Sequence, residues 1–168
     1  MKSESGLFET NLRVLPEWID ANGHLHDAHY LDIFNSGIKK LFSALGIGIS
    51  FSHQGHSIFN LGFNVDFLKE LMLDEPVRCT IQVVDWDHKR LHLYSELRHA
   101  ETDVLCATAE RLFMNISLDT RRSTDFHHEA YARIEALGNA HRVFGRPLSM
   151  GRTLGIRRKA PMPAASAI

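Results

Sequence analysis

The chain has 168 residues, 44% of them hydrophobic and 23% charged, so it can bury one core of its own without disulfide or metal support. No apolar run approaches the roughly 20 residues of a membrane-spanning helix, and the start, MKSESGLFETNLR, lacks the apolar stretch of a signal peptide. Cys79 and Cys106 lie inside alternating apolar runs, as buried free thiols do. We therefore expect a cytoplasmic protein that has no membrane partner.

The net charge of −1 conceals an uneven distribution along the chain. Residues 138–168 hold six of the 19 basic residues and no acidic one, which gives this segment +6. The remaining 13 basic residues face all 20 acidic ones in residues 1–137, a net charge of −7. We interpret residues 1–137 as one acidic domain and residues 138–168 as a basic tail containing Gly, Pro and Arg, whose order the composition leaves open.

One strand and one long helix are predicted in the first third of the chain. Residues 7–14, LFETNLRV, alternate apolar and polar side chains and predict the strand. After a turn-rich segment, apolar residues recur at helical spacing, and Asp27 can cap the helix while Gly46 ends it in the left-handed conformation. Gly37 in the middle of this helix allows close approach to another backbone.

Beyond the helix the apolar period changes from 3.6 to 2. Alternation predicts four more strands, at residues 59–67, 77–83, 91–97 and 105–113. Their connections are short and favour antiparallel pairing, since a parallel crossover needs a dozen or more residues.

A closing helix is predicted over residues 125–137, with Phe126, Ala130 and Ile134 on one face and a stop at Gly138. The order of strand, long helix and four strands predicts an α+β domain. In this domain a curved antiparallel sheet of five strands wraps around one long helix.

The loop before the long helix contains the densest group of polar side chains, namely Asp20, Asn22, His24, His26, Asp27 and His29. A helix N-terminus carries unpaired N–H groups and partial positive charge, so it polarises a carbonyl and stabilises an oxyanion. A carboxylate at Asp20 can attack such a carbonyl or activate a water against it. The alternative is that Asp20 only binds backbone N–H groups of its turn. The histidines lack the cysteine or H-E-x-x-H pattern of a metal site, so we expect no metal.

The D-x-x-G-H pattern of Asp20, Gly23 and His24, followed by Tyr30 in the helix, resembles the 4-hydroxybenzoyl-CoA thioesterase-like family of hotdog-fold enzymes. The resemblance covers about residues 8–137. The segments EWIDANGHLHDAHYLDIF, GHSIFNLGFNVDFLKEL and DHKRLHLYSEL are closer still to thioesterases of carnitine and betaine breakdown, which are proposed to act on betainyl-CoA. The resemblance implies hydrolysis of a small acyl-CoA, with no separate cofactor because coenzyme A is part of the substrate.

In that family the aspartate at this position is nucleophile or general base, and a backbone amide early in the helix binds the thioester oxygen. The resemblance therefore implies a catalytic group of Asp20, His24, Asn22 and the N–H groups near Asp27 and Ala28. Of these, His24 is expected to position Asp20 or its loop.

Residues outside this loop are candidates for the rest of the substrate. Aromatic and polar side chains are candidates for the acyl group, namely Trp18, Tyr30, Ser57, Phe59 and Asn60. Basic residues at strand ends are candidates for the CoA phosphates, namely Lys89, Arg90, Arg121 and Arg122. Core packing and solvated strand ends are the alternatives. The betaine-related subgroup commonly carries glutamate about where this chain has Gly62, although Trp18, Phe59 and Phe63 can still surround a quaternary ammonium.

The single sheet layer and the apolar strand at residues 59–67 predict a homodimer, or a tetramer of dimers, through pairing of this strand with its copy. The resemblance implies that residues 57–62 of one chain approach Asp20 of the other. Two other classes compete: another hotdog enzyme such as an enoyl-acyl dehydratase, and a non-catalytic acyl-CoA sensor whose tail binds nucleic acid. We expect no nucleic-acid partner, because the acidic domain opposes DNA and the tail offers only scattered arginines.

Overall fold

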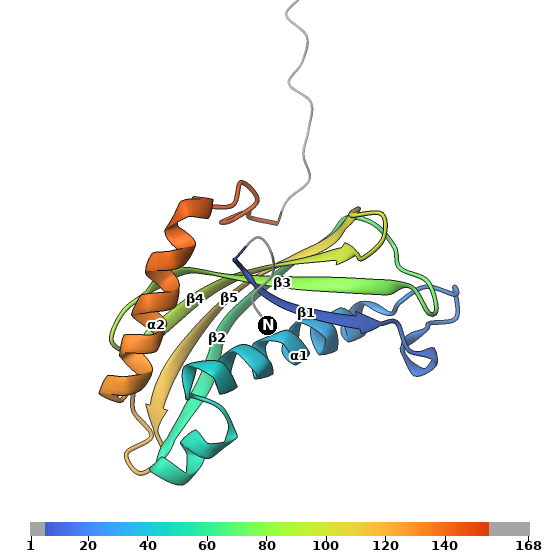
Figure 1. Cartoon of the computed structure of the whole chain (residues 1–168). Coiled ribbons are helices and arrows are strands. Elements are labelled where there is room, and N and C mark those ends of the chain that lie inside the picture. Colours follow the sequence, from blue (N-terminus) through green and yellow to red (C-terminus); the bar gives the residue numbers. More distant parts are fainter. Residues whose placement is uncertain (1–5, 155–168) are drawn as a thin grey trace, which may run out of the picture.

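The computed structural model describes residues 6–154 (Figure 1). The helices and strands are β1 (Phe8–Arg13), α1 (Asp27–Leu45), β2 (His56–Phe67), β3 (Pro76–Trp86), β4 (Arg90–His99), β5 (Leu105–Ser117) and α2 (His128–His141). Short 3-10 helices lie at Pro16–Trp18, Ile49–Gln54 and Arg142–Phe144. The predicted order of elements is confirmed.

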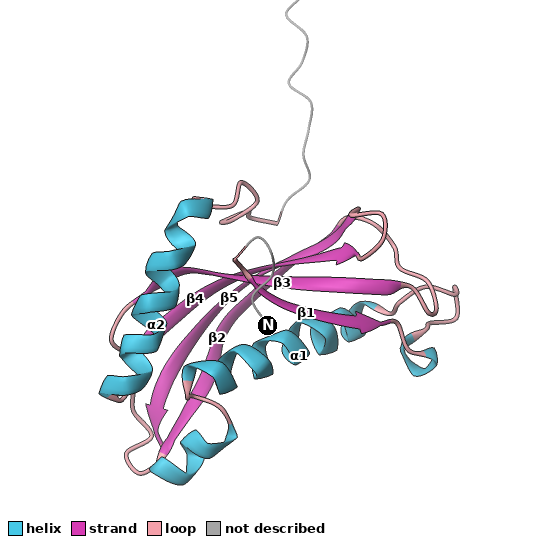
Figure 2. Cartoon of the chain, viewed as in Figure 1, coloured by secondary structure: helices cyan, strands magenta, loops and turns pink. Residues whose placement is uncertain are grey.

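The five strands form one antiparallel sheet in the order β1-β3-β4-β5-β2. The sheet curves around α1, which lies across its concave face (Figures 1 and 2). The strands β3, β4 and β5 pair as a meander, as their short connections predicted, whereas β1 and β2 form the two edges. The predicted curved five-stranded sheet around one long helix is confirmed.

Helix α1 buries one apolar stripe against the sheet, made of Tyr30, Ile33, Phe34, Gly37, Ile38, Leu41 and Leu45. A Cβ at Gly37 would lie 3.1 Å from Ile81 Cδ1, so this glycine makes room for side chains of β3 and not, as predicted, for another backbone. The helix ends at Gly46, whose φ is 78°. The predicted start differs by one residue, because His26 is the N-cap and Asp27 is the first helical residue.

Helix α2 packs on β3 and on the C-terminal half of α1, burying Ala130 and Ile134 as predicted. The predicted bounds are wrong at both ends, because α2 begins at His128, after the buried Phe126, and continues past Gly138 to His141. Gly138 is needed for another reason: its backbone lies against the Trp86 ring, where a Cβ would collide. The buried His141 accepts a hydrogen bond from the Val83 backbone N–H at 2.9 Å. The predicted domain boundary at residue 138 therefore falls inside a packed helix.

The segment after α2 crosses the face of the sheet opposite α1. It makes polar contacts with each strand from β3 to β2, through the pairs Gln82–Gly145, Tyr94–Ser149, Glu110–Gly151 and Asp66–Arg152. Part of the predicted tail therefore belongs to the folded domain, while the basic residues 157–159 lie outside the described residues. Within residues 6–154, no helix has the length and hydropathy to cross a membrane.

Candidate active site

Asp20 closes the tight turn that precedes α1. Its Oδ1 accepts hydrogen bonds from the backbone N–H groups of Asn22 at 2.8 Å and His24 at 3.2 Å. Its own N–H donates to the His24 carbonyl at 2.9 Å, and Gly23 completes the turn with a φ of 84° that favours glycine. The N–H of His24, and next that of Asn22, lower the pKa of the Asp20 carboxyl below its usual value. This group is therefore an ionised carboxylate held in one orientation.

The Asp20 side chain lines a pocket of about 550 Å³ between the start of α1 and the connection from β2 to β3. The pocket is lined by Asp20, Leu25, His26, Asp27, Tyr30, Phe67, Leu68, Lys69 and Glu70. Tyr30 is 4% exposed, packs edge-to-face on Phe67, and donates a long hydrogen bond of 3.4 Å to the Lys69 carbonyl. Burial raises the pKa of Tyr30 to about 12, so it remains a neutral hydroxyl. The structure thus brings a carboxylate and a helix N-terminus to one pocket.

The first turn of α1 is already in contact with an anionic side chain. The Ala28 N–H, a predicted donor to the thioester oxygen, lies 2.7 Å from Asp27 Oδ1 and 3.2 Å from His26 Nδ1. Asp27 and His26 are exposed, so both side chains have room to move. A substrate oxygen that binds this N–H must therefore displace the Asp27 carboxylate.

Trp18 and the histidines of the loop fix the start of α1. The Trp18 carbonyl accepts from the His26 N–H at 2.9 Å, and its ring stacks on His29 with centroids 6.0 Å apart. His24 forms a β-bridge with Met72, which ties the turn to the connection before β3.

In the described part of the chain, no group of three His, Cys, Asp or Glu side chains is arranged to hold a metal ion.

The other predicted substrate residues lie at the opposite end of β2. Ser57, Phe59 and Asn60 occupy its first half, and Arg121 places its guanidinium 5.5 Å from the centroid of the Phe59 ring. Ser57 lines a second cavity, of about 510 Å³, between α1, the following 3-10 helix and the start of β2.

The predicted phosphate-binding cations gather near this same end. Arg122 accepts at its carbonyl from Ser117 at the end of β5, and the Lys89 carbonyl accepts from Asn115. Arg90 binds Asp87 at 2.6 Å, and Lys89 Nζ lies 3.7 Å from Asp125. Only the exposed Arg121 and Arg122 are without a carboxylate partner among these four, as far as the described residues show.

Ser57 and Phe67 are ten residues apart on one strand, which corresponds to roughly 33 Å at 3.3 Å per residue. Phe67 lines the Asp20 pocket, whereas Ser57 lines the second cavity. Residues 57–60 and Asp20 of the same chain therefore cannot contact one acyl group.

Arg111, which was not predicted from the sequence as a functional residue, is 6% exposed on the α1-facing side of β5. Its Nη1 donates to Asn35 Oδ1 at 2.8 Å, and its guanidinium lies between Phe63 and Phe113, 4.8 and 5.0 Å from their ring centroids. The signal was present in the sequence, because residue 111 continues the inward alternation of Ala107, Ala109 and Phe113. A charge at an inward position is rare and often functional.

A curved sheet around one helix, with a carboxylate turn leading into that helix, is the arrangement of a hotdog-fold thioesterase. The chain belongs to the thioesterase-like superfamily, whose family model matches residues 14–165. It is 38% identical over 144 residues to a betainyl-CoA thioesterase of Pseudomonas aeruginosa, covering 85% of this chain and 91% of that protein. The predicted family, hotdog fold and thioesterase class are thereby confirmed.

Two solved structures agree with this assignment. A hypothetical protein of Staphylococcus aureus, solved in complex with CoA, superimposes with a TM-score of 0.85 at 30% identity, covering 90% of this chain and 96% of that one. A putative thioesterase of Pseudomonas putida superimposes with a TM-score of 0.77 at 30% identity, covering 89% and 96% of the two chains.

Proposed function

We propose that this chain hydrolyses a small acyl-CoA thioester in the pocket where the Asp20 carboxylate meets the N-terminus of α1. One observation carries the proposal: a carboxylate fixed by two backbone N–H groups and a helix N-terminus line the same pocket of about 550 Å³. Such a helix end stabilises the negative charge that develops on the thioester oxygen. The pocket therefore supplies both the base or nucleophile and the electrophilic support.

Both backbone N–H groups bind Oδ1 of Asp20, so Oδ2 is the oxygen that acts. It either attacks the thioester carbon, expelling the CoA thiolate and leaving a mixed anhydride that water hydrolyses, or takes a proton from the water that attacks. In both routes the oxyanion binds the Ala28 N–H in place of Asp27. Asn22 and His24 position Asp20 through their backbone, and Tyr30 closes the wall of the pocket.

The complete site forms between two chains. Strand β2 is an edge strand whose apolar residues Phe59, Leu61 and Phe63 are 38%, 47% and 38% exposed, which suits pairing with a second copy. Antiparallel pairing of two β2 strands about a two-fold axis places the start of each strand beside the end of the other. Ser57 and Asn60 of one chain then reach the Asp20 pocket of its partner, in a dimer or a tetramer of dimers.

The substrate is an acyl-CoA with a short acyl group, betainyl-CoA or a related thioester. Arg121 and Arg122 bind CoA phosphates from the rim, with Lys89 and Arg90 beside them. The reaction needs no metal and no separate cofactor, and we place it in the cytoplasm.

The test is a panel of acyl-CoA thioesters, with release of free CoA thiol followed by a colorimetric thiol reagent. Turnover of at least one short acyl-CoA is expected. Tight binding of acyl-CoA with no thiol release would instead support a non-catalytic sensor, and hydration of an enoyl-CoA without thiol release would support a dehydratase.

A further inference from the structure

The guanidinium of Arg111 is a buried cation whose protein partners are neutral. Besides Asn35, it bonds Asn60: Nη2 donates to the side-chain oxygen at 3.2 Å when the Asn60 amide is oriented to satisfy its own neighbours, Gly62 and Leu112. Its Nε, also buried, has no hydrogen-bond partner. Among residues 6–154, no carboxylate oxygen lies within 4.0 Å of this guanidinium. One of its donors is thus left over.

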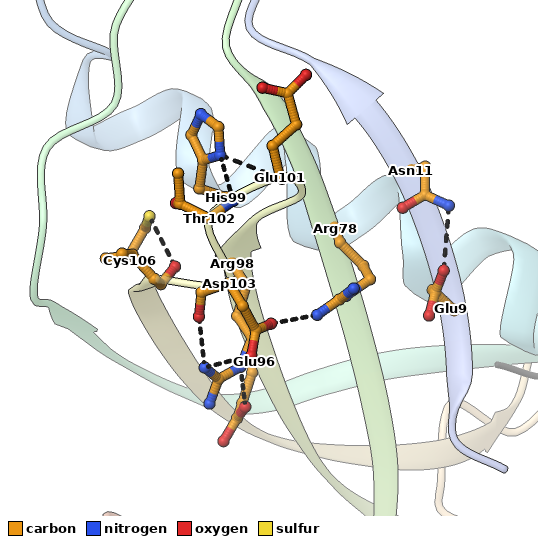
Figure 3. A network of polar contacts seen from close by, with 11 residues as sticks. Glu9, Asn11, Arg78, Glu96, Arg98, His99, Glu101, Thr102, Asp103 and Cys106 are labelled. Atoms are coloured by element: carbon orange, nitrogen blue, oxygen red, sulfur yellow. Dashed lines mark hydrogen bonds and ion pairs between the residues drawn. The ribbon is translucent and has the colours of Figure 1, made fainter. Parts of the chain in front are cut away.

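Half-buried arginines elsewhere in the sheet are paired in the usual way. Figure 3 shows Arg78 and Arg98 bonded to Asp103, with Arg98 also held by Glu96 at 2.9 Å. Arg111 is more buried than either, and burial lowers its pKa to about 10, which still leaves it charged at neutral pH. Burying a charge without a counter-charge is costly, so a site of this kind is expected to receive an anion.

Arg111 lies beside β2, the strand that meets the second chain in the proposed dimer. Asn60, one of its two amide partners, belongs to the stretch of β2 that approaches the second chain's Asp20. Phe113, which stacks on the guanidinium, packs edge-to-face on Phe42 with centroids 5.1 Å apart. Phe42 in turn lines the cavity of about 510 Å³ at the start of β2. The Phe42–Phe113 pair therefore lies between the cavity and the guanidinium.

The cavity carries one charged side chain, the cation Lys39. Among the described residues, no aspartate or glutamate lines it. The two phenylalanines of β2 that were expected to bind a quaternary ammonium already carry guanidinium groups on their faces, Arg121 on Phe59 and Arg111 on Phe63. A cationic acyl group would meet like charge at both rings.

We propose that Arg111 binds the anionic end of the acyl group, so that the preferred substrates are CoA thioesters whose acyl chain carries a carboxylate. This inference rests on the proposed thioesterase function and narrows its substrate: of betainyl-CoA and related thioesters, it selects the related thioesters with an anionic acyl chain. A carboxylate supplies the counter-charge that the buried guanidinium lacks. The guanidinium faces α1 inside the sheet and the residue is only 6% exposed, which disfavours a group as large as a CoA phosphate.

The experiment compares kcat/KM for matched thioesters, succinyl-CoA against butyryl-CoA and glutaryl-CoA against pentanoyl-CoA, with betainyl-CoA as the cationic case. We expect the wild-type protein to favour the carboxylated member of each pair by about 10- to 100-fold, the scale of one charge-assisted hydrogen bond. Arg111→Gln should bring this ratio to about 1, and Arg111→Lys should restore part of it. Arg78→Gln, which removes a paired arginine on β3, is the control and should leave the ratio unchanged.

Binding of the same pairs to the Asp20→Asn protein, measured by calorimetry, tests Arg111 independently of turnover. If no thioester is hydrolysed but the carboxylated ligands still bind more tightly through Arg111, the proposed function fails and this inference stands. Hydrolysis with a ratio near 1, or a preference for betainyl-CoA, overturns the inference alone. The inference is also overturned if Arg111→Gln disrupts the dimer but keeps the wild-type ratio of kcat/KM between carboxylated and neutral thioesters. In that case the anionic partner of Arg111 is a side chain of the second chain.

Discussion

Replacing Asp20 by asparagine removes the negative charge of the carboxylate and leaves an oxygen in the place of Oδ1. That oxygen can still accept the N–H groups of Asn22 and His24, now at 2.8 and 3.2 Å, so the turn before α1 should persist. The amide is neither a base nor a nucleophile, however. We therefore expect kcat/KM to fall by at least about 100-fold, the usual effect of removing a positioned acid or base.

The pH dependence of the wild-type protein gives a second measure of the same group. The N–H groups of His24 and then Asn22 lower the pKa of Asp20 below its usual value of 3.8, so the carboxylate stays ionised to a lower pH than an ordinary aspartate does. The plot of kcat/KM against pH reports groups of the free enzyme, so the acidic limb caused by protonation of Asp20 should have its midpoint below pH 3.8.

The assay is thiol release by the purified variants, with thermal melting and scattering to show that fold and assembly are kept. Asp20→Ala is the matched comparison, because it loses both the charge and the two hydrogen bonds and should also lower the melting temperature. If Asp20 served only the turn, Asp20→Asn would keep near-normal kcat/KM and only Asp20→Ala would be impaired. That pattern would refute the catalytic assignment.

Three further predictions follow from the geometry. Asp27→Ala removes the closer of the two acceptors of the Ala28 N–H, leaving only His26 Nδ1, and takes a negative charge away from the oxyanion. We therefore expect kcat/KM to rise by about 2- to 10-fold, and a fall would show that the carboxylate itself contributes. Leu61→Asp puts a charge on the exposed edge of β2, so we expect light scattering to show a monomer, with at least about 10-fold less activity. A wild-type protein that is a compact and fully active monomer would contradict a site shared between two chains. Deleting residues 155–168 should leave the melting temperature unchanged and raise KM in a salt-sensitive way, while deleting residues 139–168 also removes His141 and should lower the melting temperature by at least about 5 °C.

Local signals in the sequence were sufficient for most of the fold. The alternation of residues 59–67 and the helical spacing after Asp27 both follow from which face each element buries, so they were readable without the tertiary structure. Gly46 was identified as a helix end because its role is local. Gly138 was misjudged because its reason for being glycine is the Trp86 ring, which lies about fifty residues earlier in the chain.

The candidate site was less accessible to sequence reasoning. The turn at Asp20 is local and was found, but the placement of Ser57 and Phe67 at opposite ends of one strand appears only when the strand is laid out in the sheet. Arg111 was missed because its neighbours Asn35 and Phe63 are 76 and 48 positions away in the sequence. The surroundings of Arg111 come from α1, β2 and β5, which are distant in the sequence. The sequence alone shows only a charged residue at an inward position of a strand.

The basic tail now divides into two parts with different roles. Arg142 lies over the Trp86 ring at 5.4 Å, and Arg152 binds Asp66 at 2.7 Å while the Gly151 N–H binds Glu110. Of these contacts, the Arg152–Asp66 pair neutralises an acidic side chain on the outer face of the sheet, as expected when a +6 segment is tethered to a −7 domain. A cationic side chain that already pairs with a carboxylate of its own protein adds little to the binding of a polyanion such as nucleic acid. The shorter truncation, after Leu154, removes three of the six tail cations, Arg157, Arg158 and Lys159, and leaves all of these contacts in place, so it separates the charge of the tail from its contribution to folding.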